Sequence, residues 1–231
     1  MQRIVVLNPK GGSGKTTLAT NLAAYYATQG RNTALMDSDP QGSSSRWLGK
    51  RAGNLPAIHL IAAYEKSLRV TRSFLLRAPP GTERIIVDTP AAIPAQVMPE
   101  FVRDADAILV PVLPSDIDIH ACSRFIADLL LVARVRPSEN RIGVIANRTR
   151  RNTLALDRLL RFLATLQIPV ITTLRDSHNY LRAAEGGHGV HEMKSYLVRE
   201  DLDSWQPLID WLEQRRGGSA AVPAAGLEAV V

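Results

Sequence analysis

A segment near the start of the chain has the residue types that bind nucleotide phosphates. It reads Asn-Pro-Lys-Gly-Gly-Ser-Gly-Lys-Thr-Thr over residues 8–17 and follows an apolar run. Glycines let backbone N–H groups converge on phosphate oxygens, a lysine meets the β- and γ-phosphate charge, and a hydroxyl at the next helix start ligates Mg²⁺. Lys15 and Thr16 stand where this chemistry needs them. The segment predicts a phosphate-binding loop.

The loop departs from the ordinary pattern of such loops. That pattern has a glycine five residues before Gly14, where this chain has Pro9, and Lys10 adds a second lysine beside the glycine pair.

Two further segments carry carboxylates after apolar runs. Residues 37–42 read Asp-Ser-Asp-Pro-Gln-Gly, and residues 85–90 read Ile-Ile-Val-Asp-Thr-Pro. A purely structural interpretation of Asp37 and Asp39 is a helix cap and a turn before Pro40. Asp88 alone would be a weak signal, but the four apolar residues before it and the preceding loop favour a functional role.

Taken in order, these segments resemble the ParA/MinD family of ATPases. Residues 10–17 look like the family's deviant Walker A motif, residues 37–42 like its switch I, and residues 85–90 like its Walker B and switch II. Residues 145–148, Ile-Ala-Asn-Arg, are similar to the strand end that reads adenine. The resemblance covers about residues 1–190, and the length is most like that of short ParA proteins that segregate plasmids or position cytoplasmic cargo.

The resemblance implies ATP and Mg²⁺ as cofactors and a role for each site residue. The implied nucleotide-binding residues are Gly11, Gly12, Ser13, Gly14, Lys15, Thr16, Thr17 and the adenine-reading Asn147. The implied Mg²⁺ site consists of Thr16, Asp37 and Asp88, and the implied catalytic residues are Lys10, Lys15 and Asp39. In this scheme Lys10 reaches across a homodimer to the partner's phosphates, and Asp39 orients the attacking water. Hydrolysis of ATP to ADP and phosphate would then depend on dimerisation.

Alternating apolar and helical stretches must supply the elements that position these loops. Seven short runs are expected to be strands: residues 4–7, 33–36, 58–61, 84–87, 107–112, 142–146 and 169–172. Helices are expected at residues 16–29, 120–136, 153–166, 177–184 and 204–216. Most runs are apolar on both faces, which is typical of central parallel strands. The sequence predicts an α/β doubly wound fold, a P-loop NTPase of ParA/MinD type, with a mostly parallel sheet covered by helices on both faces. This domain is expected over residues 1–216, with a flexible tail at 217–231.

Composition excludes several classes of protein. The 231 residues hold one cysteine, Cys122, so the chain alone cannot form an internal disulfide, and the redox branch of the family, which needs several cysteines, is excluded. The first residues lack the features of a signal peptide, which favours a cytoplasmic protein. The tail at 217–231 has no Lys or Arg, which argues against stable membrane association.

The net charge of +6 is concentrated in one stretch. Residues 148–182 hold seven Arg and two Asp, a net of +5. Such a surface can neutralise phosphates without reading sequence, so nonspecific double-stranded DNA is the predicted partner. The predicted DNA contacts are Arg150, Arg151 and Arg182, with Arg158 and Arg161 as weaker candidates and a solvated helix face as the alternative for each. Arg148 directly follows Asn147, and contacts to the nucleotide or to a second copy are the alternatives for it.

The predicted function is an ATPase that dimerises on ATP, coats nucleoid DNA and positions a cargo. A cargo-associated adaptor, ParB-like or another small partner, would stimulate hydrolysis. The cargo is left open among a plasmid, a chromosome, carboxysomes and chemoreceptor arrays. Two alternatives are a metabolic P-loop ligase or synthetase acting on a small molecule, and a MinD-like membrane-associated positioning ATPase.

Overall fold

A parallel sheet forms the centre of the protein. The structure, a computed structural model, describes residues 1–64, 77–165 and 168–215. Within these residues the sheet has seven strands in the order β3-β2-β4-β1-β5-β6-β7, all of them parallel to their neighbours. The strands are β1 (Gln2–Val6), β2 (Thr33–Asp37), β3 (His59–Ala62), β4 (Arg84–Asp88), β5 (Ala107–Val112), β6 (Ile142–Thr149) and β7 (Val170–Arg175). The predicted sheet is confirmed, and every expected strand is present.

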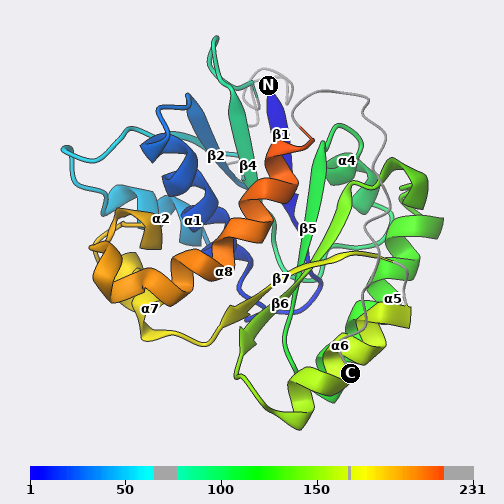
Figure 1. The fold of residues 1–231 in the computed structure, drawn as a ribbon. Helices are drawn as coiled ribbons and strands as arrows, with labels where there is room; N and C mark the ends of the chain where they lie inside the picture. Colours follow the sequence, from blue (N-terminus) through cyan, green and yellow to red (C-terminus); the bar gives the residue numbers. More distant parts are fainter. Residues whose placement is uncertain (65–76, 166–167, 216–231) are drawn as a thin grey trace.

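Helices cover both faces of the sheet, as predicted (Figure 1). One layer consists of α1 (Lys15–Thr28), α2 (Ser43–Gly49), α7 (His178–Glu185) and α8 (Ser195–Glu213). The opposite layer consists of α4 (Met98–Val102), α5 (Asp116–Leu131) and α6 (Leu154–Thr165). Two short 3₁₀ helices, Pro137–Glu139 and Val190–Glu192, lie in connecting segments. This arrangement is a doubly wound α/β fold.

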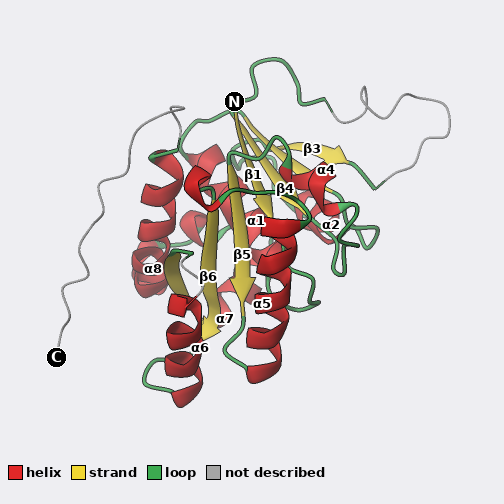
Figure 2. Ribbon diagram, turned by 90° about the vertical axis from the view of Figure 1, so that its right-hand side faces the viewer, coloured by secondary structure: helices red, strands yellow, loops and turns green. Residues whose placement is uncertain are grey.

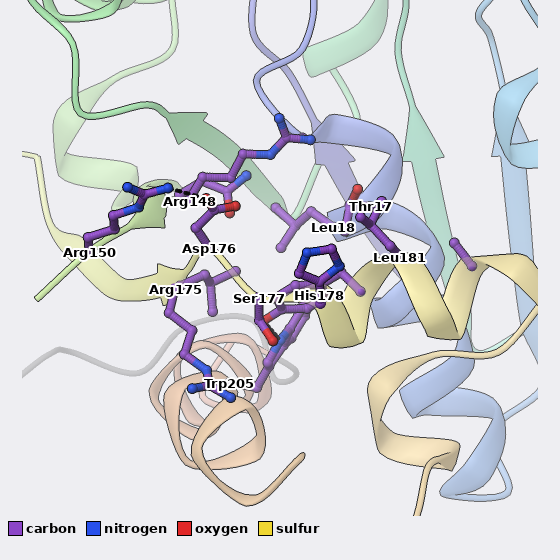
Figure 3. Close-up of a pocket in the computed structure, with 15 residues that line it drawn as sticks. Thr17, Leu18, Arg148, Arg150, Arg175, Asp176, Ser177, His178, Leu181 and Trp205 are labelled. Carbon is purple, nitrogen blue, oxygen red and sulfur yellow. Dashed lines mark hydrogen bonds and ion pairs between the residues drawn. The ribbon is translucent and has the colours of Figure 1, made fainter. Parts of the chain in front are cut away.

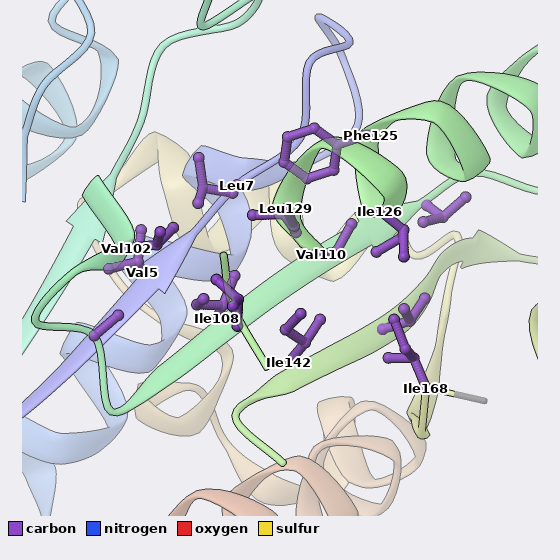
Figure 4. Packing of buried hydrophobic residues seen from close by; sticks show 14 of the residues in the cluster. Val5, Leu7, Val102, Ile108, Val110, Phe125, Ile126, Leu129, Ile142 and Ile168 are labelled. Carbon is purple, nitrogen blue, oxygen red and sulfur yellow. The ribbon is translucent and has the colours of Figure 1, made fainter. Parts of the chain in front are cut away.

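The two faces of the sheet bury separate cores, because successive strand side chains point to opposite faces. In β1, Ile4 and Val6 pack in the cluster that includes α1 and α8, whereas Val5 packs with α5. Figure 4 shows the second cluster, in which Phe125 of α5 lies over the sheet. Cys122 is buried in the same cluster, as a packed side chain. Burial on both faces explains why the central strands are largely apolar, whereas the edge strands β3 and β7 keep exposed positions.

The strand order creates a crevice at the carboxyl end of β1. This strand pairs with β4 on one side and with β5 on the other. After β1 the chain continues through α1 to β2, on the β4 side, whereas the strands that follow β4 lie on the β5 side. Ligands of open α/β sheets bind where connections diverge in this way. Figure 2 shows the labelled strands β5 and β6 ending at the same lower edge, where α5 and α6 begin.

The helix boundaries differ most from prediction at α5 and α8. Helix α5 begins at Asp116 because Ser115 caps it, its hydroxyl accepting the Asp118 N–H at 3.2 Å. Helix α8 was predicted from residue 204, which is wrong: it begins at Ser195 and continues through Pro207. Buried side chains in its first half, such as Val198, hold the early turns against the sheet. Helices α2 and α4 were not predicted; both are short.

Some predictions concern residues outside the described part of the chain. The end of the expected helix 153–166, the domain boundary at residue 216 and the tail at 217–231 lie there. Among the described helices, none combines the length and apolar character needed to cross a bilayer.

His191 is a titratable side chain packed among aromatic rings, and we expect it to make the fold sensitive to acid. Its ring packs between Tyr25 and Trp205, with centroid distances of 4.8 and 5.5 Å. Burial lowers the pKa of His191 to about 4, and its Nδ1 has no hydrogen-bond partner in the described structure. The unfolded chain takes up this proton near pH 6.5 and the folded chain only near pH 4. The free energy of unfolding should therefore fall by up to about 3 kcal/mol as the pH drops through that window.

We expect His191→Phe to remove most of this pH dependence, because phenylalanine fills the site without titrating. Urea unfolding followed from pH 7 to pH 4 measures it. The matched control is His120→Phe, at an exposed position on α5, which should keep the wild-type slope. Identical slopes for His191→Phe and the wild type would contradict the assignment.

Candidate nucleotide-binding site

The predicted phosphate-binding loop connects β1 to α1 at the crevice. Gly12 and Gly14 have φ angles of 76° and 95°, in the left-handed region that favours glycine. Gly14 is the N-cap of α1, and a Cβ at this position would collide with the side-chain amide of Asn147. The loop thus leaves the N–H groups at the start of α1 facing the crevice, an arrangement suited to anions.

Lys15 and Asn147 both contact the loop backbone. Lys15 Nζ donates to the Lys10 carbonyl at 3.1 Å, and Asn147 Nδ2 donates to the Ser13 carbonyl at 2.8 Å. Burial lowers the pKa of Lys15, and the carboxylates of Asp88 and Asp39 oppose this shift. The Lys15 ammonium therefore lies in the field of two carboxylates of the predicted site.

Asp88 ends β4 with a fully buried carboxylate. One of its oxygens, Oδ2, accepts a short hydrogen bond from the Ser44 hydroxyl, and the other, Oδ1, has no partner in the described structure. Burial raises the pKa of Asp88 to about 6, while the hydrogen bond from Ser44 and the nearby hydroxyl of Thr16 oppose this shift. An unpartnered buried carboxylate oxygen next to a threonine hydroxyl fits a hard cation such as Mg²⁺, which prefers oxygen ligands.

Asp37 and Asp39 organise the segment between β2 and α2. Asp37 Oδ2 accepts hydrogen bonds from the backbone N–H and the hydroxyl of Ser45, at 2.8 and 2.7 Å. Asp39 Oδ1 accepts the Gln41 N–H at 2.9 Å. Asp39 thus forms the turn at Pro40 considered from the sequence, whereas the N-cap of α2 is Gly42 and Asp37 binds the first turn of this helix from the end of β2. Asp37 and Asp88 are paired in register on neighbouring strands, so both carboxylates reach the same edge.

Lys10 lies at the outer side of the loop. Its Nζ forms an ion pair with Asp118 Oδ1 at 2.8 Å; the Lys10 side chain is 37% exposed and that of Asp118 only 6%. Asn8 fixes the loop beneath it, because Asn8 Oδ1 accepts the Lys10 N–H at 2.7 Å while Asn8 Nδ2 donates to the Pro111 carbonyl at 2.6 Å. In the single chain, the Lys10 side chain is thus paired with α5, while its backbone carbonyl accepts the hydrogen bond from Lys15.

A cavity of about 470 Å³ opens beside the loop (Figure 3). Gly14 and Thr17 line its loop side, and Asn147 lies among its walls. The remaining walls come from the start of α7, including His178 and Leu181, and from the ends of β6 and β7. The cavity continues directly from the phosphate-binding loop, so its position suits the base and ribose of a nucleotide.

A buried carboxylate on α8 fixes one wall of this cavity. Asp201 accepts hydrogen bonds from Arg175 Nε at 2.6 Å, from Asn179 Nδ2 at 2.6 Å and from Ser177 Oγ at 3.2 Å. These bonds join the end of β7 to the start of α7. The interactions with Asp201 raise the pKa of the Arg175 guanidinium further.

The sequence did not reveal Ser44, Ser45, Asp118 and Asp201 as parts of the site. Ser45 follows Asp37 by eight residues, but Ser44 meets Asp88 from 44 residues away. Only Asp118 had a local signal in the sequence: Ser115 stands three residues before it, a pattern typical of the start of a helix.

Of the arginines predicted to bind DNA, Arg150 lines the cavity, and Arg151 and Arg182 are next in sequence to residues that line it. Arg150 is 79% exposed and lies 3.6 Å from Asp176, and Arg151 is exposed in the same loop between β6 and α6. Arg182 is exposed on α7. Arg158 lies 3.9 Å from Asp116 on α5, so this weaker candidate has an acidic neighbour. The structure leaves all three primary candidates accessible.

The sheet order, the phosphate-binding loop after β1 and the carboxylates on β2 and β4 define a P-loop nucleotide-binding fold. The chain belongs to the CobQ/CobB/MinD/ParA nucleotide binding domain family, whose model matches residues 4–190. The predicted family membership is confirmed.

Individual relatives agree with this family. The chain is 28% identical over 191 residues to maintenance of carboxysome distribution protein A of Halothiobacillus neapolitanus, covering 82% of this chain and 87% of that protein. It is 54% identical over 52 residues to the chromosome-partitioning ATPase Soj of Thermus thermophilus, covering 22% of this chain and 21% of Soj. Its fold is similar to that of a putative plasmid partition protein of Borrelia burgdorferi bound to AMPPNP, with a TM-score of 0.69 at 15% identity, over 90% of this chain and 98% of that one.

Proposed function

We propose that this chain is a ParA-type ATPase that positions a cargo by binding to nucleoid DNA. Two ATP-bound copies dimerise, the dimer binds nucleoid DNA nonspecifically, and a cargo-associated adaptor stimulates hydrolysis and release. One observation carries the proposal: at one edge of the sheet, the phosphate-binding loop with Lys15 lies beside the carboxylates of Asp37 and Asp88. The same loop carries a second lysine, Lys10, on its outer side.

Within one subunit, Lys15 would bind the β- and γ-phosphates and the start of α1 would cradle them. Thr16, Asp37 and Asp88 would hold Mg²⁺, which would neutralise phosphate charge when bound. The free Oδ1 of Asp88 and the hydroxyl of Thr16 beside it support this set. To bind the ion, the Asp88 carboxylate would have to be ionised, and its hydrogen bond from Ser44 favours that form.

The second copy would complete the site. Lys10 has a partly exposed ammonium on a flexible four-carbon stem, so it can exchange Asp118 for a partner's phosphates. Two phosphate chains bound face to face would supply the negative charge that favours this exchange. Hydrolysis would then require the dimer, because each active site would use a lysine from the other subunit.

Nonspecific DNA would bind to exposed arginines beside the nucleotide cavity. Arg175 does not contribute, because Asp201 and Glu200 on α8 pair with it at 2.6 and 2.5 Å. Arg150, Arg151 and Arg182 remain accessible, and dimerisation would double their number on one particle. Paired weak contacts raise apparent affinity strongly, so DNA binding should depend on ATP.

We expect Arg150→Ala, Arg151→Ala and Arg182→Ala each to weaken duplex DNA binding by about 3- to 10-fold at roughly 0.1 M salt. Each should also reduce the slope of log affinity against log salt by about one. Fluorescence anisotropy with the ATP-bound protein and duplexes of different sequence measures both effects.

The matched control for the DNA surface is Arg124→Ala, which removes an exposed arginine within α5, outside both α7 and the loop between β6 and α6. It should leave affinity and salt slope unchanged. Equally tight binding by the ADP-bound and ATP-bound wild-type proteins would contradict the proposed coupling.

For the cargo, one relative that matches 82% of this chain is named for carboxysome distribution. We therefore propose a carboxysome or a similar protein compartment as the cargo. A fluorescent fusion in the native host should coat the nucleoid, and deletion of the gene should cluster these compartments. Plasmid loss with normally spaced compartments would instead assign the chain to partition.

A further inference from the structure

Arg148 has a backbone conformation that arginine rarely adopts. Its φ is 50°, in the left-handed region where a Cβ is unfavourable. The residue sits between Asn147 and Thr149, where the register of β6 against β7 shifts. Such conformations persist only where the surroundings impose them, and they gather at ligand sites.

The neighbours of Arg148 impose this conformation. Asn147 is buried and bound to the Ser13 carbonyl at 2.8 Å, and Thr149 is buried with its hydroxyl donating to the Leu174 carbonyl at 3.2 Å. With both neighbours fixed inward, the Arg148 side chain is turned outward and exposed at the rim of the cavity.

The guanidinium of Arg148 has no hydrogen bond or ion pair within the described part of the chain. By contrast, Arg150 lies near Asp176, and Arg175 is bound by Asp201. In Figure 3 the Arg148 side chain extends toward the ribbon of the phosphate-binding loop and α1, whereas the Arg150 side chain points to Asp176. Gly14, at the start of α1, lines the same cavity as Arg148.

An unpaired cation and a helix N-terminus on one cavity favour an anionic group between them. We propose that Arg148 binds the phosphate chain of the nucleotide in its own subunit, from the side of the base cavity and near the α-phosphate. The inference rests on the nucleotide site of the proposed function. Arg148 would be the third cation of that site, after Lys15 and Lys10, and its left-handed backbone conformation would direct it to the phosphates.

The test uses Arg148→Asn in the full-length protein, with calorimetric titrations of ATP, ADP, AMP and adenosine. Asparagine tolerates the left-handed conformation but carries no charge. The affinities for all three phosphate-bearing ligands should fall by about tenfold, as for loss of one charge-assisted hydrogen bond. Adenosine binding should not change, and Arg148→Lys should recover part of the loss. The melting temperature of the ligand-free protein should stay equal or rise.

The matched control is Arg134→Asn, because Arg134 is also an exposed arginine with a left-handed φ, of 54°, but follows the far end of α5. It should bind all four ligands as the wild type does. An equal loss for adenosine would mean that Arg148 only shapes the base cavity, and would overturn the inference. So would normal ADP and AMP binding with loss of ATP-driven dimerisation alone, which would place the contact across the dimer. If the wild-type protein binds no ATP, the proposed function itself fails; if it binds ATP and Arg148→Asn binds as well, only this inference fails.

Discussion

Replacing Lys15 with alanine is expected to lower the affinity for ATP by about a hundredfold or more. Its ammonium is the buried cation of the phosphate-binding loop, donating in the ligand-free chain to the Lys10 carbonyl at 3.1 Å. Bound to two phosphates, it would make charge-assisted hydrogen bonds worth about 1.5–3 kcal/mol each. Isothermal titration with ATP and Mg²⁺ measures the loss.

Folding should survive this change. Burial lowers the pKa of Lys15, which means that the folded protein already bears a cost for keeping this group charged. Alanine removes the cost together with one hydrogen bond, so the melting temperature should change little. The control Lys194→Ala removes an exposed lysine at the start of α8 and should bind ATP normally. Wild-type affinity in Lys15→Ala would place the phosphates elsewhere.

The sheet and the phosphate-binding loop were predictable because their signals are local. Apolar runs mark the seven strands, and the signal is strongest in the central strands, which are buried on both faces and therefore largely apolar. The loop residues from Lys10 to Thr17 are contiguous, so their spacing alone places lysine and hydroxyl at the helix start. Asp37 and Asp88 were found for a similar reason, as each directly ends an apolar run.

The contacts around these residues were not predictable, because they join segments far apart in the chain. Ser44 reaches Asp88 only because α2 packs beside β4's end, and Asp118 reaches Lys10 only because β5 lies next to β1. The net charge of residues 148–182 was misleading for the same reason. Glu200 and Asp201, which form ion pairs with Arg175, come from α8 and lie outside the stretch whose charge was counted. The formal charge of this stretch therefore overstated the number of arginines available to bind DNA.

Asp39→Ala is expected to stop hydrolysis while leaving ATP binding intact. Asp39 is half-buried between β2 and α2, and its charge influences Lys15 from across the site. A carboxylate there can orient the attacking water, a role that contributes about 10²–10⁴-fold to rate. Turnover of ATP should fall by at least about a hundredfold, and the ATP-bound dimer should accumulate on DNA. Phosphate release and DNA co-sedimentation measure the two effects.

The variant Asp39→Asn separates catalysis from structure. Asp39 also accepts the Gln41 N–H at 2.9 Å, and an asparagine side chain can accept the same bond. If Asp39 acts through its charge on water, Asp39→Asn should be as slow as Asp39→Ala although its turn is preserved. If Asp39 only holds the turn, Asp39→Asn should hydrolyse ATP at the wild-type rate, and the catalytic assignment would be wrong. Asp203→Ala, which removes an exposed carboxylate from α8, should leave turnover unchanged and so excludes a general effect of net charge.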